Sequence, residues 1–422
     1  MGKITKIIAY EIIDSRGYPA IESRLTLDNG IEVVTSVPSG STVGKYEALE
    51  LRDNDPARFD NMGVRKAVSY INELLSPKLI GIQPTKQVEI DYWLIKADGT
   101  KNKSRLGANT TLAISQLLTK AAAADNHIPL FRYINTLYKS IFAKDIVIDR
   151  IPSPIFSIIN GGKHANNNLD FQEFQIVPSS SFNFAKAYQI GVEVYHELKR
   201  VLEYRNASVS VGEEGGFTPN FSTNLDALEV LNEALNQRNL KPGLDVFFGL
   251  DIAANHFYKD DRYIVKDKPH PLKREEYIEY LLHLLSVYSV LAIEDPLQDD
   301  DWDGWKKMSE STPEQTYLVG GNLLATNKER LSRAIKESSC SSILIKPSQI
   351  GTVTETLELI NLARQNKFSY IISQRSGETN DTFVADLAVG LQADFVRFGA
   401  PSRGERVAKY NRLWQIESLE MI

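Results

Sequence analysis

Four polar residues each follow a short apolar run, and together they could remove a proton next to a carboxylate. Asp251 ends FFGLD, Glu294 ends LAIE, Lys346 ends SILIK, and Arg375 lies just beyond YIIS. A pair of carboxylates suits a hard divalent cation such as Mg²⁺. A lysine beside such an ion has a lowered pKa and can act as a base, while an arginine can clamp a carboxylate or phosphate. The four residues indicate metal-assisted enolate chemistry on a small anionic acid.

Further candidates lie between residues 160 and 214. His164 begins the polar stretch HANNN, and Glu173 lies in the next apolar segment. Glu213 and Glu214 lie in the glycine-rich SVSVGEEGGFTP, at the predicted exit of a strand. Two adjacent carboxylates cannot both stay unpaired in a dry site, so one is expected to have the raised pKa of a general acid. The alternatives are a solvated loop histidine and, for Asp251 and Glu294, strand-end carboxylates bonded to lysines.

The elements that must position these residues alternate between apolar runs and helical stretches. This alternation predicts a parallel sheet, and so many repeats predict a barrel, whose chemistry lies at the C-terminal strand ends. Residues 4–36 predict three strands with a hairpin at Asp28-Asn29-Gly30, and residues 57–138 predict helices. The loop at residues 37–45, VPSGSTVGK, is either a flexible connection or a lid that supplies oxygen ligands.

The composition narrows the classes of protein. The 422 residues carry a net charge of −6 with a pI of about 5.7, which is a poor match for nucleic acid. The single cysteine, Cys340, can form no internal disulfide, which is consistent with a reducing cytosol. No secretory signal and no apolar stretch long enough to cross a bilayer is apparent. The sequence predicts a cytoplasmic protein without a nucleic-acid or membrane partner.

The ordered motifs resemble those of the enolase family over nearly the whole chain. They are DSRGYPAIE, VPSG, EALELRD, NKSRLGANTTLAISQ, IINGGKHANNN, DFQEF, VGEEGGFTP, LDIAANHFY, IEDPLQDDDW, LIKPSQIGT, RSGETNDT and GAPSRGER. The resemblance implies an N-terminal α+β domain, placed at residues 1–139, and an atypical (β/α)₈ TIM-type barrel at residues 140–422. It also implies a homodimer and Mg²⁺-dependent lyase chemistry on 2-phosphoglycerate or a related acid.

The resemblance assigns acid–base roles to the first group of candidates. Lys346 would be the base that takes the C2 proton. Glu214 would be the acid that assists loss of the 3-hydroxyl, with Glu173 beside it. His164 would contact the substrate.

The resemblance also assigns binding roles. Arg375 and Ser376 would hold the phosphate, and Asp251 and Glu294 would bind the first Mg²⁺. Gln374 and Arg397 occupy two further substrate-binding positions, but they differ from the family pattern there. The family's histidine is Gln374, which forms hydrogen bonds but cannot carry a proton charge. The family's lysine is Arg397, which keeps the charge but changes the geometry.

Two more departures concern metal ligands. Where the family has a metal-binding aspartate in V-[GA]-D-D-L, this chain has VGGNL, with Gly321 at the ligand position and Asn322 next to it. One of three carboxylate ligands is therefore absent, and Asn322 or water would replace it only weakly. Thr42 stands where a serine binds the second metal, and it keeps a hydroxyl.

The changed positions surround one pocket, whereas Glu214 and Lys346 remain. This pattern favours a changed substrate over loss of function. The leading hypothesis is a diverged enolase paralogue that acts on a small phosphorylated or phosphonylated acid. Its precedent in kind is the enolase-like enzyme of phosphonate synthesis that makes carboxyphosphonoenolpyruvate. The alternatives are an ordinary phosphopyruvate hydratase and a catalytically silent enolase-like binding protein.

Overall fold

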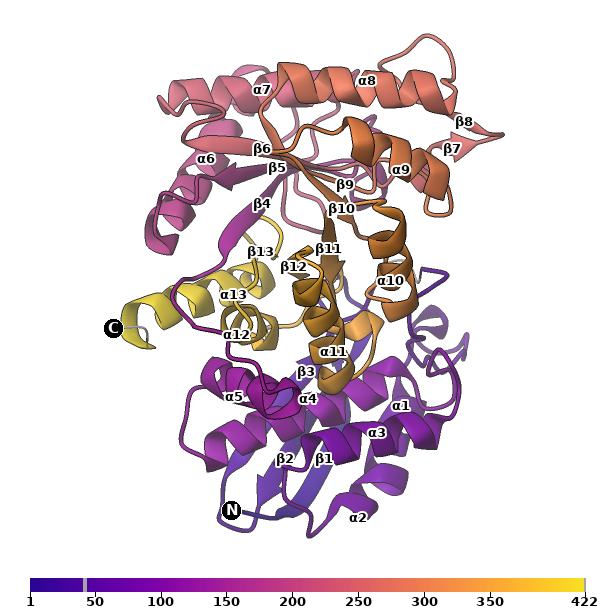
Figure 1. Cartoon of the computed structure of the whole chain (residues 1–422), viewed down its shortest axis with the longest axis vertical. Helices are drawn as coiled ribbons and strands as arrows, with labels where there is room; N and C mark the ends of the chain where they lie inside the picture. The colour runs from indigo at the N-terminus through magenta and orange to yellow at the C-terminus, as the bar shows by residue number, and fades with distance from the viewer. Residues whose placement is uncertain (41–43, 421–422) are drawn as a thin grey trace.

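The computed structural model describes residues 1–40 and 44–420 (Figure 1). An N-terminal unit of three strands and several helices lies at one end of the molecule, and a closed barrel with surrounding helices forms the rest. Thr42, the predicted ligand of a second metal, lies outside the described residues. Among the described residues, no helix is both long and apolar enough to cross a membrane.

The N-terminal strands β1 (Ile4–Ile13), β2 (Pro19–Leu27) and β3 (Glu32–Val37) form an antiparallel sheet. The pleat directs alternate side chains to opposite faces. The structure confirms the three predicted strands. It also confirms the hairpin between β2 and β3, where Gly30 has a φ of +86° that glycine adopts without steric cost.

Helices pack against this sheet and against one another. They are α1 (Arg65–Ser69), α2 (Ser76–Leu79), α3 (Gln87–Asp98), α4 (Ala108–Asp125) and α5 (Leu130–Phe142), with the short turns η1 (Phe59–Asn61) and η2 (Tyr70–Leu75). Helix α4 is buried along most of its length because it packs between β2, β3 and helices of the barrel side. The predicted helical region therefore begins at residue 65, later than expected, since Phe59 and Asp60 have positive φ angles.

The barrel has eight strands in the closed order β10-β11-β12-β13-β4-β5-β6-β9. They are β4 (Ser153–Asn160), β5 (Glu173–Pro178), β6 (Val246–Asp251), β9 (Val290–Glu294), β10 (Tyr317–Gly320), β11 (Ser342–Ile345), β12 (Ser369–Ser373) and β13 (Phe395–Arg397). Every pair is parallel except those of β5, which is antiparallel to β4 and β6. Residues 161–172 contain only the turn η3 (Gly162–His164), too little chain for the crossover that a parallel return needs. This confirms the atypical barrel.

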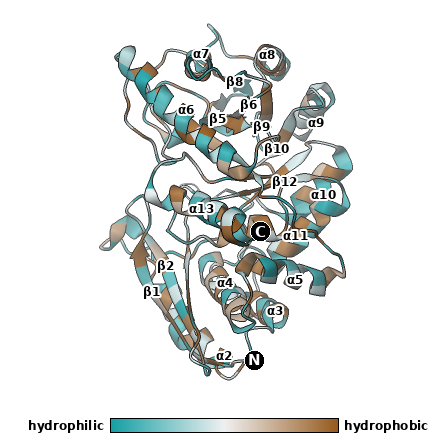
Figure 2. Cartoon of the chain, turned by 90° about the vertical axis from the view of Figure 1, so that its left-hand side faces the viewer, coloured by the Kyte–Doolittle hydropathy of each residue, from teal (hydrophilic) through white to brown (hydrophobic). Residues whose placement is uncertain are grey.

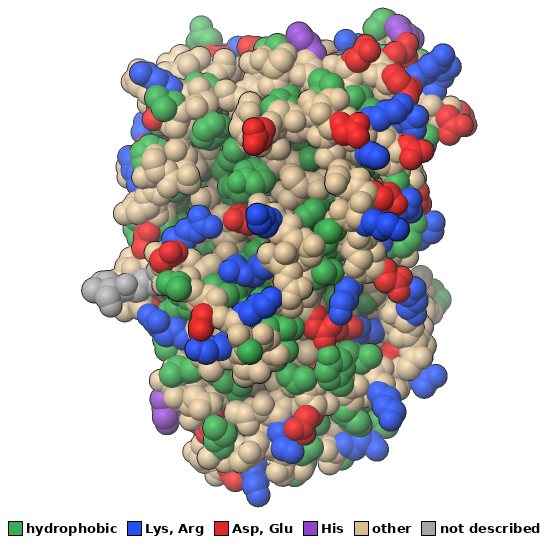
Figure 3. All heavy atoms as spheres, in the orientation of Figure 1, with side chains coloured by type: hydrophobic (Ala, Val, Ile, Leu, Met, Phe, Trp, Pro, Cys, Tyr) green, Lys and Arg blue, Asp and Glu red, His purple; other side chains and the backbone are tan. Residues whose placement is uncertain are grey.

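Helices form the outer layer of the barrel. They are α6 (Phe184–Tyr204), α7 (Asn224–Gln237), α8 (Arg274–Val287), α9 (Trp302–Ser311), α10 (Lys328–Glu337), α11 (Val353–Gln365), α12 (Phe383–Gly390) and α13 (Gly404–Gln415); the short elements are η4 (Ala254–His256), β7 (Tyr258–Lys259), β8 (Arg262–Tyr263), η5 (Pro347–Gln349) and η6 (Ile416–Glu420). Figure 2 shows polar and apolar residues alternating along α6, as expected of a helix with one face on the core. On the face seen in Figure 3, positive and negative side chains are intermixed.

A layer of apolar side chains fills the barrel interior below the ends of the strands. This layer consists of Ile155, Val177, Ala292, Val319, Leu344, Ile371 and Phe395. Because this layer fills the barrel, polar groups that need access to a ligand are confined to the C-terminal strand ends. The predicted domain boundary between residues 139 and 140 falls within α5, and residues 143–152 then lead to β4. The boundary stays a prediction.

Candidate active site

Polar side chains from several strands meet at one mouth of the barrel. Asp251 and Glu294 are the last residues of β6 and β9, and Lys346 directly follows β11. Glu173 is the first residue of β5, and because β5 runs in the opposite direction, it pairs with Asp251 at the same mouth. The cavity there is lined by Gly40, Glu47, Lys163, His164, Gln172, Glu214, His256, Asn322, Lys346, Gln349, Ser373, Gln374, Arg375, Ser376 and Arg397.

Glu214 is a buried carboxyl with a neutral hydrogen-bond partner. It is 4% exposed, and Nε2 of Gln374 donates to its Oε2. Burial raises the pKa of Glu214; the nearby Arg406 opposes the shift, whereas Glu173 adds to it. Glu214 therefore has the raised pKa expected of one member of the pair. The predicted strand before it is wrong: residues 207–210 form no strand. Val211 bridges Phe217 within the segment, and Phe217 bridges Ile159 of β4.

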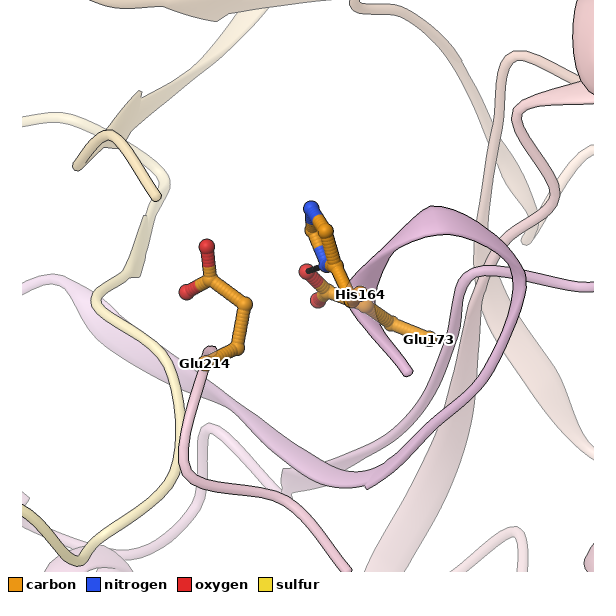
Figure 4. Close-up of side chains that lie close together, drawn as sticks. All are labelled: His164, Glu173 and Glu214. Atoms are coloured by element: carbon orange, nitrogen blue, oxygen red, sulfur yellow. Dashed lines mark ion pairs between the residues drawn. The ribbon is translucent and has the colours of Figure 1, made fainter. Parts of the chain in front are cut away.

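His164 and Glu173 form an ion pair beside Glu214. Nδ1 of His164 lies 3.1 Å from Oε1 of Glu173, and Figure 4 shows Glu214 beside this pair, with ligand atoms of the three side chains within 4.8 Å of one another. Ser157 Oγ and Gln175 Nε2 donate to Oε2 of Glu173 at 2.6 and 2.8 Å. Burial disfavours the charged imidazole, but the Glu173 and Glu214 carboxylates outweigh this effect and raise the pKa of His164. The loop histidine is thus a buried site residue and not a solvated one.

Glu173 is held in its charged form. Burial alone would favour the neutral acid, but the charge of Arg397 and the contacts with His164 and Ser157 lower the pKa of Glu173. Glu173 and Glu214 are neighbours with opposite shifts. Both have a guanidinium at 3.6 Å, but Glu173 also contacts His164, whereas Glu214 accepts from the amide of Gln374. Of the two, Glu214 is therefore the better candidate for a proton donor.

Lys346 lines the same cavity, and its backbone N donates to Thr326 Oγ1 at 3.0 Å. Burial and the positive charges of Arg397 and Arg375 lower the pKa of Lys346. A lysine with a lowered pKa can be a neutral amine, which is the form that accepts a proton.

Arg375 is held by carboxylates from the N-terminal domain. Its Nη1 lies 2.7 Å from Oε2 of Glu47, and its Nη2 lies 3.8 Å from Oε1 of Glu50. A Cβ at Gly40 would lie 1.8 Å from Nη2, so this close approach requires glycine. Ser376 is also buried at the cavity. The structure therefore brings both predicted phosphate-binding residues to the site.

Arg397 lies between the two carboxylates that were predicted to bind the first metal. Its Nη1 lies 2.9 Å from Oδ2 of Asp251, 2.9 Å from Oε2 of Glu294, and 3.6 Å from Oε2 of Glu173. Burial opposes the guanidinium charge, but these three carboxylates raise the pKa of Arg397. Burial also raises the pKa of Glu294, against the effect of Arg397.

The stretch that lacks the family aspartate lies directly against Glu294. A Cβ at Gly321 would lie 2.5 Å from Oε1 of Glu294 and 2.7 Å from Oδ2 of Asp295. The backbone N of Gly321 and that of Asn322 donate to the Asp295 carboxylate at 3.0 and 2.6 Å. Asn322 lines the cavity, so it is near the predicted ligands.

Arg406 is a site residue that the sequence analysis missed. It is fully buried on α13, and its Nη1 donates to Oε1 of Gln374 and to the carbonyl of Arg375. Its Nη2 donates to the carbonyls of Glu213 and Ser376 at 2.9 and 2.6 Å. One guanidinium therefore fixes the loops of Glu214 and Arg375 together. On a polar helix such as GERVAKYNR, an arginine gives no local signal of this role.

Comparisons with known proteins cover both parts of the fold. Residues 4–134 match the family model "Enolase, N-terminal domain", and residues 149–420 match "Enolase, C-terminal TIM barrel domain". The chain is 43% identical over 414 residues to a protein named Enolase from Ehrlichia canis (strain Jake), covering 98% of this chain and 96% of that one. It belongs to the enolase family. It is also 42% identical over 416 residues to Enolase from Ehrlichia chaffeensis (strain ATCC CRL-10679 / Arkansas), covering 99% and 96%.

Membership of the enolase family confirms the recognised fold and the enzyme class. The family is metal-dependent, and one group of described residues could hold a cation. It consists of His164, Glu173 and Glu214, whose ligand atoms all lie within 4.8 Å of one another. This group differs from the predicted ligands Asp251 and Glu294, and it contains the nitrogen of a histidine, whereas Mg²⁺ prefers oxygen ligands.

Proposed function

We propose that this protein is a phosphopyruvate hydratase: a lyase that removes water from 2-phosphoglycerate to give phosphoenolpyruvate. The observation that carries the proposal is the pair Lys346 and Glu214 at one cavity, with a lowered pKa for the amine and a raised pKa for the carboxyl. These shifts are in the directions that favour a neutral amine and a neutral carboxyl, the forms that an elimination through an enolate requires.

The bonding changes balance without a further reagent. The neutral amine of Lys346 takes the proton from the carbon next to the substrate carboxylate. The electrons of that C–H bond form the double bond, and the bond from the neighbouring carbon to its hydroxyl breaks. Glu214 gives its proton to the departing hydroxyl, which leaves as water.

Two arginines are suited to hold the substrate anion. Arg375, with Ser376, would receive the phosphate, because a guanidinium fork matches its oxygens. Arg397 would face the carboxylate from the other side of the cavity. The cavity measures only about 50 Å³, against about 300–1,000 Å³ for typical ligand pockets. Substrate therefore enters when side chains at the mouth move apart.

A second candidate keeps the same chemistry but changes the acid. Gly321, Gln374 and Arg397 alter the predicted contacts to metal and substrate, which favours a diverged paralogue acting on a phosphonylated acid, of the kind that makes carboxyphosphonoenolpyruvate. The relatives that are 42 and 43% identical are named Enolase, and for this reason the ordinary reaction is placed first.

The resemblance implies a magnesium ion bound by Asp251 and Glu294. Between Asp251 and Glu294, the residues present do not fit a magnesium ion: Arg397 contacts both carboxylates, and Gly321 offers no side chain. Mg²⁺ requires nearly octahedral oxygen coordination. No step above is therefore routed through it. We further propose a cytoplasmic location and a homodimer, as the composition and the family resemblance predict.

A direct assay tests the proposed function. Purified protein is mixed with 2-phosphoglycerate and excess Mg²⁺, and the absorbance of the enol product is followed, with Lys346→Ala as the control. Turnover that the control abolishes supports the hydratase. A folded protein without turnover refutes it, and phosphonylated acids are then screened in the same way. If none of these acids is bound or converted, the silent binding protein becomes the better description.

A further inference from the structure

The strongest feature that the reaction does not explain is the surroundings of Arg397. One terminal nitrogen, Nη1, lies 2.9 Å from each of two carboxylates, Asp251 and Glu294, and 3.6 Å from a third, Glu173. All four side chains are 2–9% exposed. Buried carboxylates need a cation, because an unpaired buried charge is strongly destabilising. Here the chain supplies that cation from β13.

The neighbouring backbone is shaped around this arrangement. A Cβ at Gly321 would come within 2.5 Å of Oε1 of Glu294, so a side chain there would push Glu294 away from its present place. Gln172 Nε2 donates to Oδ2 of Asp251 at 3.2 Å, the oxygen that Arg397 also contacts. Gly321 and Arg397 are thus compatible with each other. Gly321 has no side chain that could serve as a third metal ligand, and Arg397 fills the space between the two predicted ligands, Asp251 and Glu294.

One oxygen remains open. Oδ1 of Asp251 is buried and has no hydrogen-bond partner among the described residues. This oxygen would supply one of the six ligands that Mg²⁺ requires, and it can equally accept a hydrogen bond from water. Whether a divalent ion competes with Arg397 at this place is therefore a question for experiment.

We propose that the guanidinium of Arg397 replaces a divalent metal ion between Asp251 and Glu294, so that this half of the site carries a built-in cation. The inference rests on the proposed function only for the place of the substrate carboxylate. Among the described residues, no hydrogen bond is made by Nε or Nη2 of Arg397. These nitrogens carry three N–H donors in a planar fork, which suits a carboxylate. One guanidinium would thus neutralise Asp251 and Glu294 and also bind the substrate.

The first test is cation binding to the metal-free full-length chain, which does not depend on activity. Mg²⁺ is titrated by calorimetry, and Mn²⁺ is titrated by electron paramagnetic resonance, each with and without inorganic phosphate. We expect no saturable binding that depends on Asp251, so Asp251→Asn should leave the titrations unchanged. Saturable binding that Asp251→Asn abolishes overturns the proposal, whether or not the protein turns over 2-phosphoglycerate.

The second test removes the guanidinium. Arg397→Gln keeps most of the bulk but leaves the carboxylates without their cation. We expect a lower unfolding midpoint in metal-free buffer and recovery of at least about 5 °C on adding Mg²⁺, because an ion that binds only the folded state stabilises it. Adding Gly321→Asp should increase this recovery. The wild-type midpoint should move by less than about 1 °C. Arg397→Met, which also removes the positive charge, serves if Arg397→Gln does not fold.

A matched control separates this effect from the loss of any buried ion pair. Arg412 lies 2.6 Å from Oδ1 of the buried Asp386, away from the cavity. Arg412→Gln should lower the unfolding midpoint, but Mg²⁺ should not restore it. If Mg²⁺ stabilises the wild type as strongly as Arg397→Gln, or restores neither variant, the guanidinium does not stand in for a metal.

Discussion

The two halves of the barrel mouth handle buried carboxyl groups in different ways. On the β6 and β9 side, Asp251 and Glu294 share the guanidinium of Arg397. On the other side, Glu214 accepts a hydrogen bond from the amide of Gln374, while a second guanidinium, Arg406, stays 3.6 Å away. Burial raises the pKa of both Glu294 and Glu214, and a guanidinium opposes the shift in each case: Arg397 at 2.9 Å from Glu294, and Arg406 at 3.6 Å from Glu214.

This difference separates binding from proton transfer. The Arg397 half offers fixed charge of both signs and suits recognition of an anion. The Glu214 half holds a proton that can leave with a hydroxyl. The same residue type therefore serves two purposes at one mouth, beside a guanidinium in one half and beside an amide in the other.

The largest expected effect comes from removing the proton of the second half. Glu214→Gln should reduce kcat about 10²–10⁴-fold, since an amide cannot replace a general acid. Wild-type activity should fall at high pH as Glu214 loses its proton, at a pH above the ordinary range of a glutamate because its pKa is raised. Measured pH profiles of kcat/KM should lack this limb in the variant. Glu213→Gln is the matched control, and an equal loss there would remove the assignment.

Changing the partner of Glu214 should have a smaller and directional effect. Gln374→Glu places a carboxylate beside Glu214 and Arg406, and this negative charge should raise the pKa of Glu214 further. The high-pH limb of kcat/KM should move to higher pH, with a loss of rate of roughly tenfold. Gln374→Ala, which adds no charge, should not move the limb in that direction. A shift to lower pH would contradict the role given to the amide.

The anion-binding side can be adjusted through the N-terminal domain. Glu47 lies 2.7 Å from Arg375 and competes with a phosphate for it. Glu47→Gln should therefore lower KM by roughly three- to tenfold at low salt, about 1 kcal/mol of competing interaction. Steady-state kinetics at two ionic strengths provide the measurement. The more distant Glu50, at 3.8 Å, is the control, and Glu50→Gln should change KM less. A raised KM in Glu47→Gln would mean that the carboxylate positions Arg375 for the substrate.

The smallest expected effect concerns stability. The pKa of His164 is raised in the folded protein, so the native state binds a proton more tightly than the unfolded chain. The resulting stabilisation is complete below the unfolded pKa of about 6.5 and is lost as the pH rises through the folded pKa. Above a pH of about 6.5, His164→Gln should therefore make the decrease in unfolding free energy with rising pH smaller. Denaturant titrations measure it, and an unchanged slope would contradict the shift.

The sequence predicted the strand-end residues well because apolar runs followed by polar residues have a simple physical meaning in a barrel. Asp251, Glu294 and Lys346 reach the same mouth, whereas Glu173, predicted only to lie in an apolar segment, joins them as the first residue of the antiparallel β5. The sequence did not predict that Arg397 would contact both Asp251 and Glu294, because the reach of a side chain across a barrel depends on the register of β13, β6 and β9. The role of Arg406 was missed for a similar reason: its partners are backbone carbonyls of loops far away in the sequence.

The contact between Arg375 and Glu47 has a consequence for how the protein matures. The two residues are 328 positions apart, and Ser39 and Gly377 are joined nearby by two backbone hydrogen bonds of 2.8 and 2.9 Å. Contacts so distant in sequence form late, because a long loop must close first. A growing chain on the ribosome would thus have its N-terminal sheet long before it has a site. Competence to bind an anion at Arg375 should appear only when the last strands have been synthesised.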